Sequence, residues 1–253
     1  MQRLLALALL TFSAIPANAL TDRELSSIGK RVWQNECGGT REGLTSWNSG
    51  ENFASLGIGH FIWYPKGVRG PFEESFPALV RFFAANGETL PAWLKPGVPC
   101  PWRTRAEFQS AAKGKQMSEL RDLLSSTVAL QSRFLAQRME AALPKLLAAA
   151  SANQRGNVKR RFERLASSGK GTFALIDYVN FKGEGTNPSE RYNGEGWGLL
   201  QVIEGMKDDA SPVQAFGDSA ARVLARRVKN SPPERNEDKW LAGWVRRVDS
   251  YAR

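Results

Sequence analysis

The sequence predicts a mainly helical α+β protein with one small antiparallel sheet near its N-terminus. Residues beyond about 104 show helical periodicity in almost every segment, which favours a predominantly helical chain. Residues 54–64 are apolar, aromatic and glycine-containing, which is typical of a β-strand, and they follow a polar loop or hairpin at 40–53. A chain of 253 residues fits one domain, or two lobes that share a core.

The first helix is predicted over about 22–37. Thr21-Asp22-Arg23-Glu24 resembles a capping box, and Leu25, Ile28 and Val32 follow at helical spacing. Gly38-Gly39 should end the helix.

A proline-rich segment separates two parts of the chain. Four prolines fall within residues 90–103, where they oppose regular structure. We therefore expect an N-terminal lobe over 20–95, which includes a helix at 74–86, and a helical lobe over 96–253.

Seven helices are predicted beyond this segment. Pro144 should kink or divide the second of them, and the fourth is apolar enough to be buried. The predicted ranges are 105–113, 117–150, 155–167, 172–181, 197–206, 212–228 and 236–251.

Residues 1–19 read as a secretory signal peptide. Arg3 supplies the positive charge, residues 4–15 form an apolar core, and Ala17-Asn18-Ala19 is a cleavage site before Leu20. The alternative is a membrane anchor, but the apolar run is shorter than the roughly 20 residues that a span needs. No later segment is apolar enough to cross a membrane, so we expect a periplasmic or secreted protein with no stable membrane insertion after cleavage.

The charge balance favours an anionic partner. The chain has 35 basic and 25 acidic residues, a net charge of +10, and no nucleic-acid-binding motif. We therefore expect an anionic cell-envelope polymer as partner in preference to nucleic acid.

The cysteine count bounds covalent and metal chemistry. In an oxidising compartment Cys37 and Cys100 favour one disulfide, and the alternative is two separate buried thiols. Two cysteines and one histidine cannot form a conventional zinc site without carboxylates, so we expect no metal and no other cofactor.

Because the chain has a single histidine, carboxylates are the main candidates for catalytic groups. His60 is the only imidazole, and its apolar, glycine-rich surroundings favour a structural role over that of a catalytic base. Glu36 falls at the end of the first helix near Trp33, and partial burial beside an indole would keep a carboxylic acid protonated, as a general acid requires. The alternative is a solvated glutamate at a helix end.

Several polar and aromatic residues suit a sugar-binding groove, because rings stack on sugar faces and amides bind hydroxyls. Trp47, Asn48 and Glu51 lie in the polar loop, and Trp197 lies in a glycine-rich segment. Most of the eight tryptophans should belong to the core.

Three motifs, in order along the chain, resemble the phage-type lysozymes, or endolysins. They are Glu36 followed by Ser55-Leu56-Gly57-Ile58-Gly59-His60, the segment 174–185, and the segment 241–247. The resemblance implies a two-lobed lysozyme-like fold and a glycosidase that cleaves β-1,4 bonds of peptidoglycan or a related amino-sugar polymer.

Carried over by position, the resemblance gives each residue a role. Glu36 would be the general acid, and Glu42 is a rival for that role. The family's loop aspartate falls near Ser49, so Glu51 is the nearest replacement for the second carboxylate. Ser55 would position a water molecule, and His60 would lie at the wall of the cleft.

A further segment, Gly194–Val202, resembles a motif of lytic transglycosylases. In that resemblance Gln201 lies in the sugar groove, and Tyr192 and Glu195 could face it too. The alternative is an amphipathic helix with its leucines in the core.

Three alternatives to the hydrolase stay open. A lytic transglycosylase could act on the same core, with the substrate's own 6-hydroxyl as nucleophile. A chitosanase-like enzyme is possible, although its cationic substrate suits a basic protein poorly. An inactive glycan-binding protein would explain the missing loop aspartate.

Overall fold

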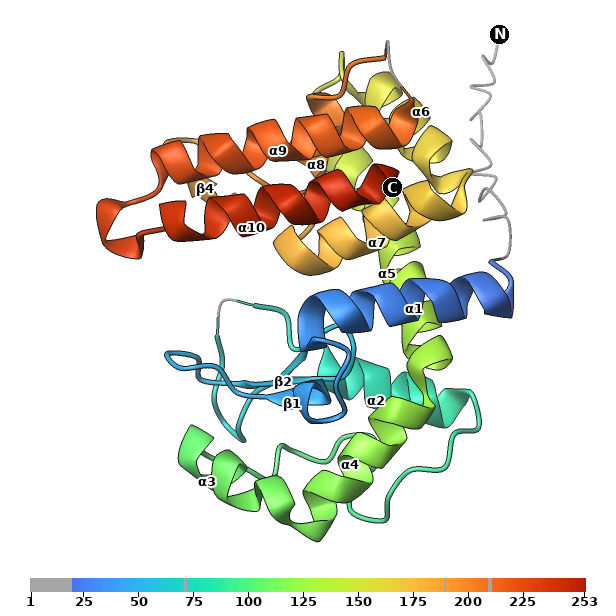
Figure 1. Cartoon of the computed structure of the whole chain (residues 1–253), viewed down its shortest axis with the longest axis vertical. Helices are drawn as coiled ribbons and strands as arrows, with labels where there is room; N and C mark the ends of the chain where they lie inside the picture. The colour runs from blue at the N-terminus through green and yellow to red at the C-terminus, as the bar shows by residue number, and fades with distance from the viewer. Residues whose placement is uncertain (1–19, 71, 189, 209–210) are drawn as a thin grey trace, which may run out of the picture.

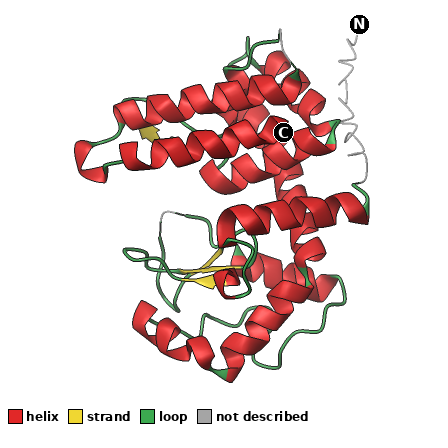
Figure 2. Ribbon diagram, in the orientation of Figure 1, coloured by secondary structure: helices red, strands yellow, loops and turns green. Residues whose placement is uncertain are grey.

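The computed structural model describes residues 20–253, except residues 71, 189, 209 and 210. The predicted signal peptide, 1–19, lies outside the described residues. The protein is mainly helical with a small three-stranded antiparallel sheet near its N-terminus, which confirms the predicted fold class (Figures 1 and 2).

Helix α1 (Asp22–Cys37) has the predicted bounds. The Thr21 hydroxyl accepts a hydrogen bond from the backbone N–H of Glu24, and the Glu24 side chain accepts one from the Thr21 N–H, so the capping box forms. Gly38 ends the helix in the left-handed region at φ 62°, which glycine adopts without strain. The side chain of Glu36 is thereby placed on the last turn.

The small sheet consists of strands β1 (Thr45–Ser46), β2 (Ala54–Leu56) and β3 (Phe61–Trp63), in that order. The prediction of one strand over 54–64 was wrong, because β2 and β3 are antiparallel strands joined by a turn at 57–60. Gly57, at φ 71°, and His60, at φ 49°, adopt left-handed conformations that reverse the chain. His60 therefore lies on a turn and not on a strand.

The proline-rich segment is part of the first lobe and not a boundary between lobes. Trp102 packs edge-on against Trp63 of β3, with ring centroids 6.3 Å apart. Beyond it, Arg121 Nε donates to Thr45 Oγ1 of β1 at 2.8 Å. The first lobe therefore also includes three helices, α2 (Phe76–Ala85), α3 (Arg105–Ser110) and α4 (Lys115–Ser126).

The long helix α5 (Val128–Ala149) connects the lobes, running from the helices around the sheet to a second, helical group (Figure 1). The predicted helix over 117–150 is divided at Thr127, whose hydroxyl donates to the Leu123 carbonyl at 2.7 Å. Pro144 lies inside α5 and does not divide it.

The second lobe consists of helices and one two-stranded ribbon. Its central helix α7 (Gly169–Lys182) is buried along much of its length, as its apolar sequence predicts. Around it lie α6 (Arg155–Ala166), β4 (Arg191–Tyr192), β5 (Glu195–Gly196), α8 (Leu199–Glu204), α9 (Pro212–Asn230) and α10 (Asp238–Asp249). Four 3-10 helices, η1 (Glu42–Leu44), η2 (Ala111–Lys113), η3 (Pro233–Arg235) and η4 (Ser250–Ala252), complete the described structure.

Among the helices in the described part of the chain, none is both long and apolar enough to cross a membrane.

Candidate active site at the junction of the lobes

Glu36 lies where α1, the turn at 57–60, α7 and α10 meet. Its Oε1 accepts hydrogen bonds from Arg247 and, at 3.3 Å, from Asn180 Nδ2. Its Oε2 lies 3.6 Å from His60 Nδ1, a contact that becomes an ion pair when the imidazole is protonated. The Glu36 side chain remains 13% exposed, so a ligand can reach a carboxylate that three other segments hold in place.

Asp177 of α7 is the buried carboxylate that supports this arrangement. Its Oδ2 accepts from Arg247 Nε at 2.8 Å and from the Tyr251 hydroxyl at 2.6 Å. Its Oδ1 accepts from Arg247 Nη2 at 2.9 Å and from Asn35 Nδ2 at 3.2 Å. With no exposed surface and both oxygens engaged, Asp177 fixes Arg247 and is itself out of reach of a ligand.

We name Glu36, His60, Asp177, Asn180 and Arg247 the junction cluster. Burial opposes the charge on Arg247, but the carboxylates of Asp177 and then Glu36 outweigh it and raise the pKa of the guanidinium further. The guanidinium also lies over the Phe181 ring, 4.1 Å from its centroid. Arg247 is therefore a permanent cation that pairs with two carboxylates: Asp177, whose two oxygens are both hydrogen-bonded, and Glu36, which is accessible.

The turn that carries His60 is braced from two sides. Gln131 of α5 accepts from the Ile58 N–H at 2.9 Å and donates to the Leu124 carbonyl at 2.6 Å. The Cys37 thiol donates to the Gly57 carbonyl at 3.4 Å. These bonds hold the imidazole against Glu36, so His60 borders the carboxylate that the sequence favours as the acid.

Lys182, at the end of α7, was not predicted as a site residue. Its Nζ lies 3.5 Å from the centroid of the Trp244 ring and 4.0 Å from that of Phe181. Burial lowers the pKa of this amine to about 6, and the cations Arg227 and Arg247 act in the same direction, against Glu237 and Glu36. A desolvated amine therefore lies close to the junction cluster.

The other predicted catalytic residues lie on the first lobe, in separate surroundings. Glu42 is exposed on η1. Glu51 lies in the loop between β1 and β2, where Asn48 Nδ2 donates to its Oε2 at 3.1 Å. Ser55 is buried on β2 opposite Ile62. Within the described residues, no hydrogen bond or ion pair connects any of the three to Glu36.

Two tryptophans that were predicted to line a groove are buried. Trp47 packs edge-on against Phe108, and its indole N–H donates to the Glu51 carbonyl at 2.8 Å. Trp197 is 9% exposed beneath Tyr192, whose ring centroid lies 4.5 Å away. Their polar sequence neighbourhoods suggested a cleft because one partner of each ring, Phe108 for Trp47 and Arg227 for Trp197, is distant in sequence.

Gln201 and Tyr192 are occupied by contacts within the second lobe. The Gln201 amide accepts from the Gly198 N–H at 2.9 Å and donates to the Gly185 carbonyl at 3.0 Å. The Tyr192 hydroxyl donates to Glu237 at 3.0 Å. Neither residue contacts the junction cluster among the interactions of the described chain.

The predicted disulfide does not form. Cys37 and Cys100 are both free and buried, and the Cys100 thiol donates to the Trp102 carbonyl at 3.4 Å. Burial raises the pKa of each thiol to about 12. The alternative of two separate thiols is the one that the structure supports.

The described residues contain no group of three or more His, Cys, Asp or Glu side chains that could hold a metal ion. Comparisons of the chain with protein-family models, with curated proteins and with solved structures find no match.

The residues that sequence reasoning missed had a weak signal. Asp177 is the one carboxylate within the apolar segment 172–181, and a buried carboxylate requires a cation. Its partner could not be identified, because Arg247 is 70 residues away in the chain and has a basic neighbour, Arg246.

Proposed function

We propose that the protein is a glycoside hydrolase that cleaves β-1,4 bonds of peptidoglycan or a related amino-sugar polymer, with Glu36 as the general acid. The position of Glu36 carries the proposal. Of the three candidate carboxylates, Glu36 is held by α7, α10 and the turn at 57–60 while its side chain stays accessible. A general acid needs this fixed geometry at a point that substrate reaches.

The junction cluster supplies groups that can stabilise the carboxylate left at Glu36 after proton transfer. Asp177 pairs with Arg247 through two hydrogen bonds, so the guanidinium keeps a counter-ion when Glu36 is protonated. Protonated Glu36 gives its proton to the glycosidic oxygen as the bond to the anomeric carbon breaks. Arg247 and Asn180 then stabilise the carboxylate that this leaves.

The second half of the reaction needs a nucleophile. In the hydrolytic form of the proposal, Glu51 faces the oxocarbenium-like charge and Ser55 positions the attacking water. This water gives its proton to Glu51 if the reaction inverts, and to Glu36 if it retains. A separation of about 6.5–9.5 Å between the acid and the second carboxyl group gives inversion, and about 5–5.5 Å gives retention.

One observation favours a lytic transglycosylase as the second candidate. The carboxylate nearest to Glu36 in the cluster is Asp177, which is fully buried with both oxygens occupied. It cannot attack a sugar or activate water. If no other carboxylate takes part, the 6-hydroxyl of the substrate attacks the anomeric carbon, gives its proton to the Glu36 carboxylate and closes an anhydro sugar.

A peptidoglycan substrate agrees with the charge of the protein, because a chain of +10 is attracted to anionic wall polymers. Export by the predicted signal peptide would bring the enzyme to this substrate in the periplasm or outside the cell.

The products of purified peptidoglycan test the proposal and separate its two forms. We expect the mature protein to release muropeptides, and mass spectrometry distinguishes reducing ends from anhydro ends, which differ by one water. Reducing ends support the hydrolase, anhydro ends support the lytic reaction, and the absence of any released muropeptide contradicts both.

A further inference from the structure

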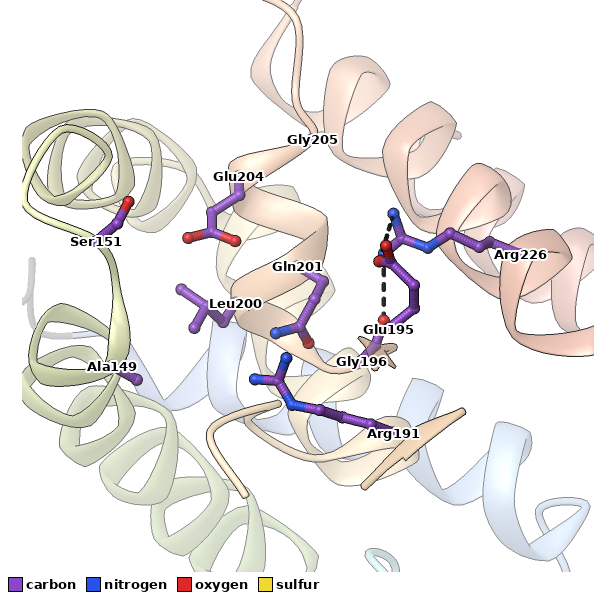
Figure 3. Close-up of a pocket in the computed structure, with 10 residues that line it drawn as sticks. All are labelled: Ala149, Ser151, Arg191, Glu195, Gly196, Leu200, Gln201, Glu204, Gly205 and Arg226. Carbon is purple, nitrogen blue, oxygen red and sulfur yellow. Dashed lines mark hydrogen bonds and ion pairs between the residues drawn. The ribbon is translucent and has the colours of Figure 1, made fainter. Parts of the chain in front are cut away.

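A cavity of about 480 Å³ opens to solvent on the surface of the second lobe (Figure 3). It is bordered by the C-terminal end of α5, the β4–β5 ribbon, α8 and α9. Its charged lining residues are Arg191, Glu195, Glu204 and Arg226. None of the residues that line it belongs to the junction cluster.

One of the two acid–base pairs in the cavity is already closed. Arg226 Nη1 lies 3.2 Å from Glu195 Oε2, and Arg226 Nη2 donates to the Gly196 carbonyl at 3.2 Å. These two side chains form a wall of the cavity and neutralise each other.

The other pair is open. Arg191 and Glu204 project into the cavity on either side of Leu200 (Figure 3). Burial raises the pKa of Glu204, and the charge of Arg191 opposes that effect, so the two groups interact across the cavity. Yet they form no ion pair within the described residues. Arg191 Nη1 donates to the Gly194 carbonyl at 3.1 Å, which leaves the other N–H groups of the guanidinium to face Glu204 across the cavity.

The floor beneath this pair is fixed. The Gln201 side chain joins the Gly198 N–H to the Gly185 carbonyl, and a Cβ atom on Gly198 would lie 2.2 Å from the Gly185 nitrogen. Such a close approach of two backbone segments requires glycine at position 198.

We propose that this cavity binds an α-amino-acid zwitterion. The ligand carboxylate pairs with Arg191, the ligand ammonium pairs with Glu204, and its aliphatic carbons rest on Leu200 and Ala149. A guanidinium and a carboxylate that are separated in space are complementary to a ligand that carries both a negative and a positive charge. A ligand with a single charge would leave one of the two protein groups unpaired.

The ligand class has two sources: a free amino acid, or the amino-acid end of a diamino acid in a cell-wall stem peptide. We assign the cavity to the stem peptide, and this part of the inference rests on the proposed function. The cavity would then hold the peptide branch of the polymer whose glycan strand is cleaved at Glu36.

Calorimetric titration with defined probes tests the assignment. The first probe is a stem tripeptide that ends in meso-diaminopimelate, and the second is the same tripeptide with lysine, which lacks the side-chain carboxylate. The third probe is free alanine. We expect the first tripeptide to bind at least about tenfold more tightly than the other two probes.

Arg191→Gln and Glu204→Gln should each weaken binding of the first tripeptide at least about tenfold. Arg81→Gln and Glu140→Gln are matched exposed controls that should leave it unchanged. Equal binding of the two tripeptides, no binding of any probe, or insensitivity to Arg191→Gln and Glu204→Gln would overturn the zwitterion site. Equal affinity for alanine would overturn the assignment to stem peptide.

The failure of this inference is separable from that of the proposed function. Titration of the Glu36→Gln variant measures binding without turnover, so the cavity can bind when the enzyme is inactive. Muropeptide release by Arg191→Gln, in turn, reports catalysis when the cavity is impaired.

Discussion

The junction of the lobes and the loop between β1 and β2 each present a glutamate, but the two are supported very differently. Glu36 contacts Arg247, Asn180 and His60 from three other segments. The side chain of Glu51 is bonded by Asn48, three residues away in the same loop. The carboxylate of Glu36 is therefore fixed by contacts between distant segments, whereas the side-chain contact of Glu51 is local to its loop.

The largest expected loss of stability comes from removing the charge of Asp177, the buried carboxylate at the junction. Asp177→Asn should lower the free energy of unfolding by about 3–5 kcal/mol, because it removes one of the two carboxylates that pair with the buried Arg247. Asp122→Asn is a matched control, since Asp122 pairs with Arg41 on the surface and should cost less than about 1 kcal/mol. Denaturant unfolding measures both variants, and equal small losses would show that the junction is not held by Asp177.

A smaller loss of stability is expected from a substitution that weakens the turn that carries His60. Gln131→Leu fills a similar volume but leaves the Ile58 N–H and the Leu124 carbonyl without partners, which should cost about 1–3 kcal/mol. The exposed Gln109→Leu on α3 is the control and should change stability by less than about 0.5 kcal/mol. If Gln131→Leu is neutral, the brace is not needed to hold the turn.

The buried amine beside the junction should produce a modest pH dependence. The pKa of Lys182 is lowered to about 6 in the folded protein, whereas a lysine in an unfolded chain titrates near 10.4. Between these values the unfolded chain binds more protons, so this residue makes the free energy of unfolding rise with pH.

Lys182→Met should therefore raise stability at pH 7 by about 1 kcal/mol and remove that part of the slope. The exposed Lys229→Met on α9 serves as the control and should keep the slope of the parent protein. Unfolding curves at several values between pH 6 and 10 make the comparison, and a slope unchanged by Lys182→Met would contradict it.

No effect at all is expected from a reducing agent. Cys37 and Cys100 are free, so a reductant should leave the melting temperature unchanged, whereas reduction of a disulfide over this loop would remove about 4 kcal/mol. Both thiols should react with a thiol reagent in denaturant and remain slow in the folded protein, because burial raises their pKa to about 12. A clear drop in melting temperature on reduction would show that the two cysteines form a disulfide.

Local signals predicted most helices well and the turns less well. The bounds of α1 follow from its capping box and Gly38, which are both encoded next to the helix. The reversal at Gly57 and the break at Thr127 were missed because apolar periodicity continues across them. In these places Gln131, from a different element, satisfies backbone groups that the periodicity does not reveal.

Only the part of the candidate site that belongs to the first helix could be predicted from the sequence. Glu36 could be selected from its helix end, but Asp177 and Arg247 belong to the second lobe, and Arg247 lies 211 residues from Glu36 in the chain. The groove residues Trp47 and Trp197 were predicted from polar neighbours, and tertiary partners bury them. Pairing between distant segments was the information that the sequence alone lacked.

The most direct test of the junction as the acid site is the rate of muropeptide release by single variants. We expect Glu36→Gln to lower the rate about 10²–10⁴-fold, as loss of a general acid does, and to keep the fold because Arg247 retains Asp177. Glu42→Gln should match the parent protein, and Glu51→Gln should fall between them. A fully active Glu36→Gln, or an inactive Glu42→Gln beside it, would contradict the account.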